Sequence, residues 1–131
     1  MSTYHGGQLV AKTLKAEGVT TVFGLAGGHV SPIFDGLLTE DIRIIDTRHE
    51  EAAVMMAEGW ARYTGRPGVA VVTAGPGVVN AFPGVAVADQ TKSPVVVIAG
   101  RSTIERRELG AMQDILHRIY QFIFLIDLQR A

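Results

Sequence analysis

Residues 69–73 read Val-Ala-Val-Val-Thr, and residues 74–77 continue as Ala-Gly-Pro-Gly. An apolar run without polar alternation is typical of a strand that is buried on both of its faces. Comparable runs occupy residues 21–25, 42–46 and 95–99. Strands of this kind belong to parallel sheets, which need helices on both sides to bury them.

Segments with helical spacing of apolar residues alternate with these strands. They span residues 8–17, 30–38 and 49–63, and a weaker one spans 81–90, where Pro83 disturbs the first turn. Strands that alternate with helices are typical of βαβ units. The sequence therefore predicts an α/β fold, a three-layer domain in which a parallel β-sheet is flanked by helices.

The composition excludes several classes of protein. Of the 131 residues, 47% are apolar and 19% are charged, which is enough to bury the core of one domain. A net charge of −1 does not favour a nucleic-acid binder or a polybasic membrane-surface module. The sequence has no cysteine, no targeting segment and no apolar run near the ~18 residues of a membrane span, so we expect a cytoplasmic protein without nucleic-acid or membrane partners.

The end of the chain differs from the rest. Residues 101–108 hold five charged side chains, and residues 115–131 are dense in large apolar ones. A segment this apolar needs a partner surface if it forms a helix. We therefore divide the chain into a domain at 1–114 and an apolar C-terminal tail at 115–131.

Chemistry is expected where the strands end, because ligands of open parallel sheets bind beyond the carboxyl ends of the strands. Residues 26–29, 47–50 and 73–77 and the segment from Gly100 onward all lie there. The strict nucleotide-phosphate motifs, a nucleophile elbow and a metal-ligand spacing are absent, so we assign no metal ligand. Taken alone, Glu50 could be no more than a favourable negative charge at the start of a helix.

Two motifs are more specific. Arg-His-Glu at 48–50 is followed by Ala-Glu-Gly-Trp-Ala-Arg at 57–62, and residues 73–80 read Thr-Ala-Gly-Pro-Gly-Val-Val-Asn. With Phe-Gly-Leu at 23–25 and Gly-His at 28–29, in this order, the chain resembles the N-terminal pyrimidine-binding (PYR) domain of thiamine-diphosphate-dependent enzymes. The resemblance runs from about Gly6 to Gln113 and is strongest to the group of acetolactate synthase, benzaldehyde lyase and the 2-hydroxyacyl-CoA and oxalyl-CoA lyases.

The resemblance implies a role for individual residues. Glu50 would hydrogen-bond to N1′ of the aminopyrimidine, where a shared proton promotes loss of the proton from the thiazolium C2. His29 and Gln113 would face the substrate, although a loop histidine and a surface glutamine are the plainer interpretations. Three further residues match the turn that packs against the aminopyrimidine, although turn and cap chemistry could also explain them: Thr73, Pro76 and Asn80.

The resemblance also implies a cofactor, thiamine diphosphate. Its Mg²⁺ would be held by the Gly-Asp-Gly…Asn motif of a diphosphate-binding domain or subunit, and this motif is absent from the 131 residues. We expect a pyrimidine-binding module of a lyase, carboligase or 2-keto acid decarboxylase that is inactive without such a partner. Its small-molecule carbonyl substrate would be a 2-hydroxy ketone, a 2-hydroxyacyl-CoA or a 2-keto acid. The alternative is an isolated, non-catalytic fragment of the fold that self-associates.

Either interpretation predicts a homo-oligomer, a dimer or larger, because apolar residues that would face a partner remain in the chain. We expect the contact near helices 49–64 and 78–90. The candidates there are Met55, Met56, Trp60, Val78, Val79, Phe82 and Val85, and in the tail Phe122, Phe124, Leu125 and Ile126.

Overall fold

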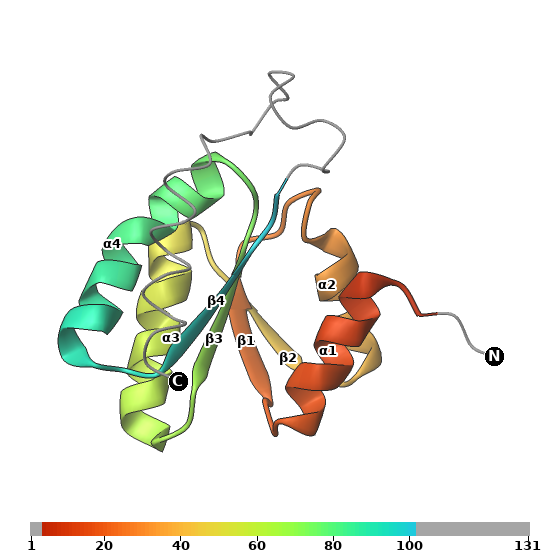
Figure 1. The fold of residues 1–131 in the computed structure, drawn as a ribbon, viewed down its shortest axis with the longest axis horizontal. Helices are drawn as coiled ribbons and strands as arrows, with labels where there is room; N and C mark the ends of the chain where they lie inside the picture. Colours follow the sequence, from red (N-terminus) through yellow and green to blue (C-terminus); the bar gives the residue numbers. More distant parts are fainter. Residues whose placement is uncertain (1–3, 102–131) are drawn as a thin grey trace.

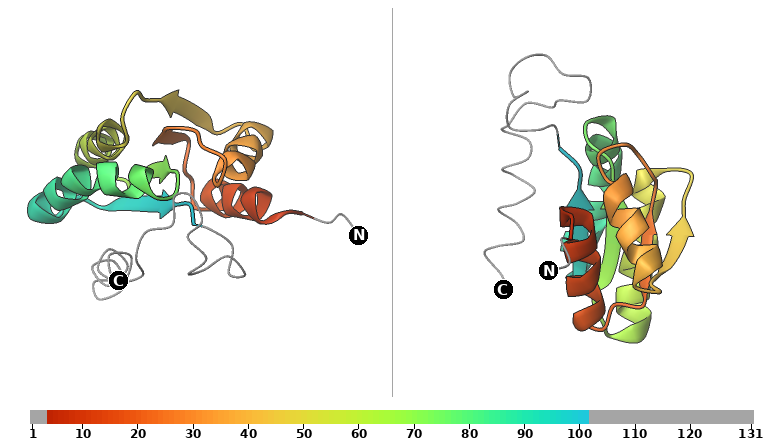
Figure 2. Two further views of the ribbon diagram at one scale, coloured as in Figure 1. Left: turned by 90° about the horizontal axis from the view of Figure 1, so that it is seen from above. Right: turned by 90° about the vertical axis from the view of Figure 1, so that its right-hand side faces the viewer.

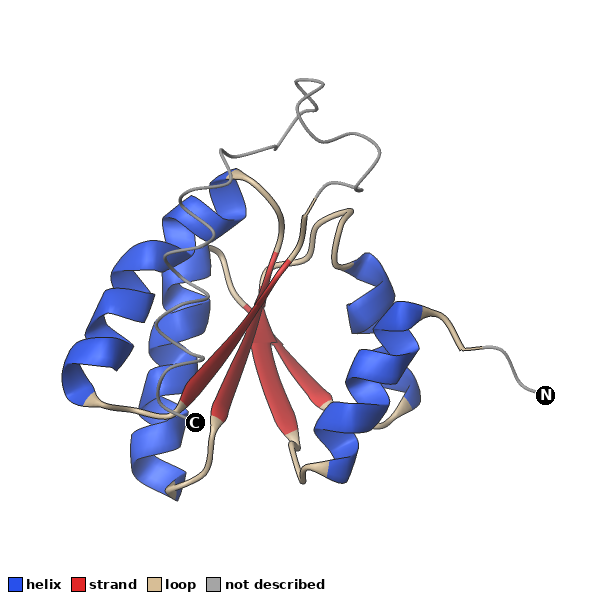
Figure 3. Ribbon diagram, viewed as in Figure 1, coloured by secondary structure: helices blue, strands red, loops and turns tan. Residues whose placement is uncertain are grey.

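The computed structural model describes residues 4–101. Helices and strands alternate strictly along the chain (Figures 1 and 3). Their bounds are α1 Gly6–Ala16, β1 Thr21–Gly24, α2 Ser31–Thr39, β2 Arg43–Asp46, α3 Glu50–Thr64, β3 Gly68–Val72, α4 Pro76–Thr91 and β4 Val95–Ala99. The predicted alternation of strands and helices is therefore confirmed.

One helix begins well before its predicted start. Helix α4 starts at Pro76, five residues ahead of the expected 81, and continues through Pro83 to Thr91. Proline suits the first helical position because its missing N–H is not needed there, and Gly75 before it takes the positive φ of 68° at which the chain turns. The Gly-Pro-Gly stretch is thus the beginning of a helix as well as a turn.

All four strands run parallel in the order β2-β1-β3-β4. Phe23 of β1 lies between Ile45 of β2 and Ala70 of β3, and Val71 of β3 pairs with Ile98 of β4. Because the strands are parallel, their carboxyl ends meet at one edge of the sheet, and the loops that follow them meet there too (Figure 1).

The sheet lies between two layers of helices (Figure 2). On one face Phe23 and Val72 pack with Val54 of α3, and Trp60 meets Phe23 edge-on with the ring centroids 6.1 Å apart. On the other face Val22 and Val71 pack with Leu37 of α2, close to residues of α1. The predicted three-layer α/β fold is confirmed.

Burial differs between the central and the outer strands. Every residue of β1 and β3 is buried, as predicted for strands covered on both faces. The same expectation is wrong for β4, where Val96 is 39% exposed, and for β2, which has no buried residue. Both are outer strands of the described sheet, so a neighbouring strand covers each on one side only.

The predicted partner-facing residues divide into two groups. Met56, Val79 and Phe82 are exposed and Met55 is half-buried, as expected of a contact surface. The expectation is wrong for Val78, which is buried, while Trp60 and Val85 are half-buried like Met55 and pack partly against the core. Two other apolar residues of these helices are exposed, namely Tyr63 and Val87. The tail residues lie outside the described part of the chain.

Within residues 4–101, no helix is both long enough and apolar enough to cross a membrane.

Candidate functional site

The loops at the carboxyl edge of the sheet are tied to one another by backbone hydrogen bonds. Thr47 donates its N–H to Gly24 at 2.9 Å, Leu25 donates to Val71 at 3.3 Å, and Gly100 donates to Val72 at 3.0 Å. These bonds tie the first residues after β1, β2 and β4 to the ends of the neighbouring strands β1 and β3. The starts of these loops therefore form one connected platform at the carboxyl edge.

Glu50 is the first residue of α3 and stands on this platform. His49 caps the helix, because its Nδ1 accepts the Glu51 N–H at 3.3 Å. The buried Thr47 hydroxyl lies within hydrogen-bond distance of the carbonyls of Gly24, at 3.2 Å, and His49, at 3.1 Å. These contacts place Glu50 at the carboxyl edge, where it is only 6% exposed.

The two oxygens of the Glu50 carboxylate differ in their partners. Asn80 of α4 donates its Nδ2–H to Oε2 over 3.1 Å. Oε1 accepts no hydrogen bond from any residue between 4 and 101, and no cation in that range forms an ion pair with Glu50. One oxygen is thus fixed and the other is available to a ligand.

Thr73 lies beside this carboxylate. Its hydroxyl is buried, and no hydrogen-bond partner for it exists among the described residues. The side chain fits between Gly27 and Gly77, and a Cβ on Gly77 would lie 2.9 Å from Thr73 Cγ2 and 3.3 Å from Glu50 Oε1. The close approach of these groups requires glycine at 77. A buried hydroxyl without a partner is costly, so the site favours a ligand that supplies one.

Pro76 belongs to the same turn, as the first residue of α4. The structure therefore brings together Glu50, Thr73 and Asn80, with Pro76 next to them in the chain. All four were predicted as site residues from the sequence. The contact that the sequence did not predict is the one between Asn80 and Glu50, which lie 30 residues apart.

His29 lies at the same edge, on the loop between β1 and α2, and is exposed. Its Cβ stands 2.7 Å from where a Cβ on Gly100 would be, and the Ala74 nitrogen stands 3.1 Å from that point. No hydrogen bond or ion pair joins His29 to Glu50 among residues 4–101. Gln113, the third predicted catalytic residue, lies outside the described residues.

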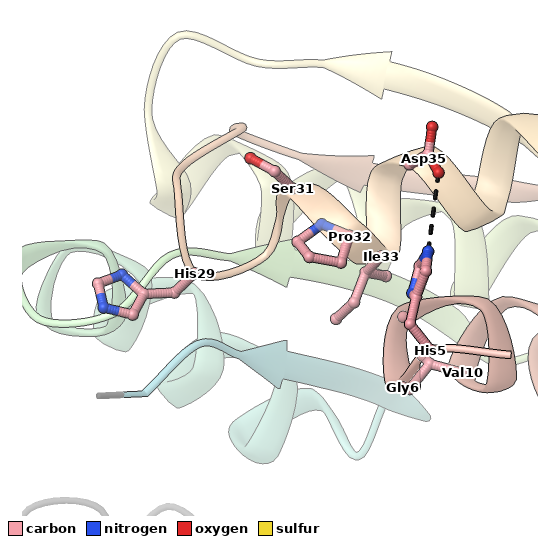
Figure 4. A pocket seen from close by; sticks show the side chains of 9 residues that line it. His5, Gly6, Val10, His29, Ser31, Pro32, Ile33 and Asp35 are labelled. Atoms are coloured by element: carbon pink, nitrogen blue, oxygen red, sulfur yellow. Dashed lines mark ion pairs between the residues drawn. The ribbon is translucent and has the colours of Figure 1, made fainter. Parts of the chain in front are cut away.

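His29 also lines an open groove of about 800 Å³ along the first turns of α1 and α2 (Figure 4). Pro32 and Ile33 form much of its wall, and His5 Nε2 lies 3.8 Å from Asp35 Oδ2 on the same groove. Sequence reasoning did not find this groove, because nothing in the sequence pairs His5 with Asp35. In the described part of the chain, no group of three His, Asp or Glu residues could hold a metal ion.

Comparison with known proteins shows which family the chain is similar to. The profile of a family described as "Thiamine pyrophosphate enzyme, N-terminal TPP binding domain" matches residues 4–121. An acetolactate synthase large subunit of Mycobacterium tuberculosis is 50% identical over 115 residues, which are 88% of this chain and 21% of that protein. The 2-hydroxyacyl-CoA lyase 2 of Danio rerio is 46% identical over 114 residues, which are 87% of this chain and 18% of that protein. The chain thus spans about a fifth of the length of these curated relatives.

Proposed function

The chain belongs to the family of thiamine pyrophosphate enzyme N-terminal domains, and we propose that it is the pyrimidine-binding module of an enzyme that breaks or forms a carbon–carbon bond next to a carbonyl. The 131 residues hold no Gly-Asp-Gly…Asn motif. The diphosphate and its Mg²⁺ would therefore be held by another domain or subunit, and the chain alone would be inactive.

The observation that carries the proposal is that only one oxygen of the Glu50 carboxylate accepts a hydrogen bond from residues 4–101. The carboxylate is buried, one oxygen is held by Asn80, and the other oxygen has no donor among residues 4–101. The Thr73 side chain lies close by, with its methyl group on the side of Gly77 and its buried hydroxyl, which has no partner among residues 4–101, on the side of Gly27. An aminopyrimidine offers a ring nitrogen, which can share a proton with a carboxylate, and an amino group, which can donate to an oxygen. The residues present therefore fit the pyrimidine end of thiamine diphosphate.

Each residue would have a separate task. Thiamine diphosphate, when bound, supplies the carbon that adds to the carbonyl and the electron sink that follows. Glu50 would hold a proton between its Oε1 and N1′ of the pyrimidine. Thr73 and Pro76 would pack against the ring and keep water away, while His29, more exposed at the same edge, would face the substrate.

The substrate class follows from the relatives. Their names, acetolactate synthase and 2-hydroxyacyl-CoA lyase, indicate substrates with a carbonyl or hydroxyl group next to the reacting bond. We extend this to the present chain as a 2-keto acid, a 2-hydroxy ketone or a 2-hydroxyacyl-CoA.

We also place the protein in the cytoplasm, because a chain without cysteine suits a reducing compartment.

The test is reconstitution. The chain is mixed with a protein that carries the Gly-Asp-Gly…Asn motif but lacks its own pyrimidine-binding domain, and thiamine diphosphate, Mg²⁺ and one substrate of each class are added. Cleavage or ligation that requires every component would support the proposal. Failure of the mixture to bind the cofactor in calorimetry would favour the alternative, a non-catalytic domain that only self-associates.

The partner surface is the second part of the proposal. Met56 and Tyr63 of α3 and Val79, Phe82 and Val87 of α4 are exposed apolar side chains on the same layer of helices. Neighbouring exposed apolar residues of this kind mark an interaction surface, and a symmetric dimer is its commonest form. We therefore propose a homodimer or larger oligomer that contacts through α3 and α4.

Light scattering at micromolar concentration tests this surface. Phe82→Glu should reduce the mass to that of one 14.0 kDa chain, because it places a charge in the contact. Leu38→Glu is the matched control, since Leu38 is 70% exposed but lies on α2 in the other layer. Wild type that is already a monomer, or equal effects of both variants, would rule this surface out. Trp60→Glu is unsuitable, because Trp60 packs on Phe23.

A further inference from the structure

We propose that Asn80 is a positioning residue for Glu50, and that its amide fixes one carboxylate oxygen so that the other, Oε1, is presented to the pyrimidine. The inference rests on the proposed function of this site. It changes the role that sequence reasoning gave to Asn80, which was contact with the cofactor. In the structure the Asn80 amide is directed to the carboxylate instead.

The geometry supports this role. Asn80 lies on α4, one helical turn beyond Gly77, and is half-buried. Its Nδ2 lies 3.1 Å from Glu50 Oε2 and connects the first turns of α3 and α4. This is the one hydrogen bond that the Glu50 side chain makes with residues 4–101. The orientation of the carboxylate therefore depends on a single donor.

A single donor is decisive because the last torsion of a glutamate side chain is soft. The carboxylate group turns freely about that bond unless something holds one of its oxygens. A hydrogen bond to an ionised oxygen is stronger than one between neutral groups, so the amide can hold it. With Oε2 held, Oε1 stays on the side of Gly77 and Thr73, where a Cβ at position 77 would lie 3.3 Å from it.

The hydrogen bond from Asn80 to Glu50 can be tested on the 131-residue chain without any cofactor. The probe is the ¹³Cδ signal and the carboxylate dynamics of Glu50, measured by NMR in wild type, Asn80→Ala and Asn80→Leu. Both variants should shift the signal and mobilise the carboxylate, because both remove the donor. Asn80→Leu keeps the branched shape of the side chain, so it serves if Asn80→Ala does not fold. Gln90→Ala, which removes an exposed amide from the same helix, should change nothing.

The consequence is tested by hydrogen–deuterium exchange at C2 of thiamine diphosphate in the reconstituted assembly. Asn80→Ala should slow exchange by about 10- to 100-fold, the range that a small misplacement of a reacting group produces. Cofactor affinity should change by no more than a few-fold, since the diphosphate end is held elsewhere. A loss of affinity without slower exchange would overturn the inference.

The two proposals can fail separately. If Glu50→Gln leaves C2 exchange unchanged, the proposed function of the site is wrong. If Glu50→Gln slows exchange while Asn80→Ala does not, Glu50 keeps its role and only the positioning role of Asn80 is refuted. An unchanged Glu50 signal in both Asn80 variants would refute that positioning role without any enzyme assay.

Discussion

Two glutamates on α3, Glu50 and Glu58, are buried to the same extent, each 6% exposed, but they are bonded very differently. Glu58 Oε1 accepts hydrogen bonds from Ser93 at 2.9 Å and Thr91 at 3.0 Å, and Arg62 lies 3.5 Å from it. Thr91 is the last residue of α4, and Ser93 lies in the turn between α4 and β4, at the amino edge of the sheet. Glu50, at the carboxyl edge, accepts one bond in the described part of the chain.

This difference is the one expected between a structural carboxylate and the reactive one that we propose at Glu50. The hydrogen bond from Ser93 lowers the pKa of the Glu58 carboxyl, against the opposing effect of burial, and Thr91 and Arg62 add to the lowering. The hydrogen bonds of Glu58 thus connect α3 to the end of α4 and to the turn before β4. Glu50 has an oxygen without a donor among residues 4–101, at the edge where parallel sheets bind ligands. Equal burial alone therefore does not distinguish the two glutamates, whereas the number of donors does.

The largest expected effect is on proton removal from the cofactor. In the reconstituted assembly, Glu50→Gln should slow C2 exchange by about 10²- to 10⁴-fold, the contribution of a positioned acid–base group. Glu58→Gln, the matched change eight residues further along the same helix, should leave the exchange rate within a few-fold, because Glu58 lies at the other edge. Equal slowing in both variants would abolish the distinction between the two carboxylates.

A smaller effect is expected from His29, which belongs to the carboxyl edge but forms no hydrogen bond or ion pair with Glu50 among residues 4–101. His29→Ala should lower turnover by roughly 10- to 100-fold, the lower end of what acid–base side chains contribute, and leave cofactor affinity within a few-fold. Steady-state kinetics and a cofactor titration on the same sample separate the two quantities. Parallel loss of cofactor binding would mean that the loop at 27–29 has only a structural role.

For thermal stability we expect the reverse order, with a larger loss in Glu58→Gln than in Glu50→Gln. Glu58→Gln replaces a carboxylate that accepts from three donors, so the thermal midpoint of this variant should lie about 5 °C below that of wild type. The midpoint of Glu50→Gln should fall by less. Thermal unfolding of the 131-residue chain, followed by circular dichroism at neutral pH, measures both. A larger loss in Glu50→Gln would show that Glu50, and not Glu58, is the structural carboxylate.

The smallest expected effect is a change with pH in the gap between the thermal midpoints of wild type and Glu58→Gln. Because the pKa of Glu58 is lowered in the folded chain, its stabilisation is complete above its ordinary value of 4.5 and is lost as the pH falls through the folded value. The gap in thermal midpoint between wild type and Glu58→Gln should therefore narrow as the pH falls below about 4.5. A gap that stays constant or widens on acidification would contradict the direction of the shift.

The sequence predicted the sheet, because buried strands leave an unmistakable run such as residues 69–72. It could not tell outer strands from central ones, since Val95–Ala99 is as apolar as β3 although Val96 is exposed. It misjudged Val78 because a helix shows its exposed face only after its neighbours are known. Glu50, Thr73 and Asn80 were predicted as site residues through resemblance. Their contacts depend on how α4 packs on α3, which no local pattern encodes.

The most direct test of the central claim is a crystal structure of the reconstituted assembly with thiamine diphosphate bound. We expect N1′ of the pyrimidine within hydrogen-bond distance of Glu50 Oε1, Asn80 still on Oε2, and the Thr73 hydroxyl covered by the ring or bonded to it. A pyrimidine that binds away from Glu50, or a Glu50 carboxylate that faces N1′ with the oxygen now held by Asn80, would contradict the distinction between its two oxygens.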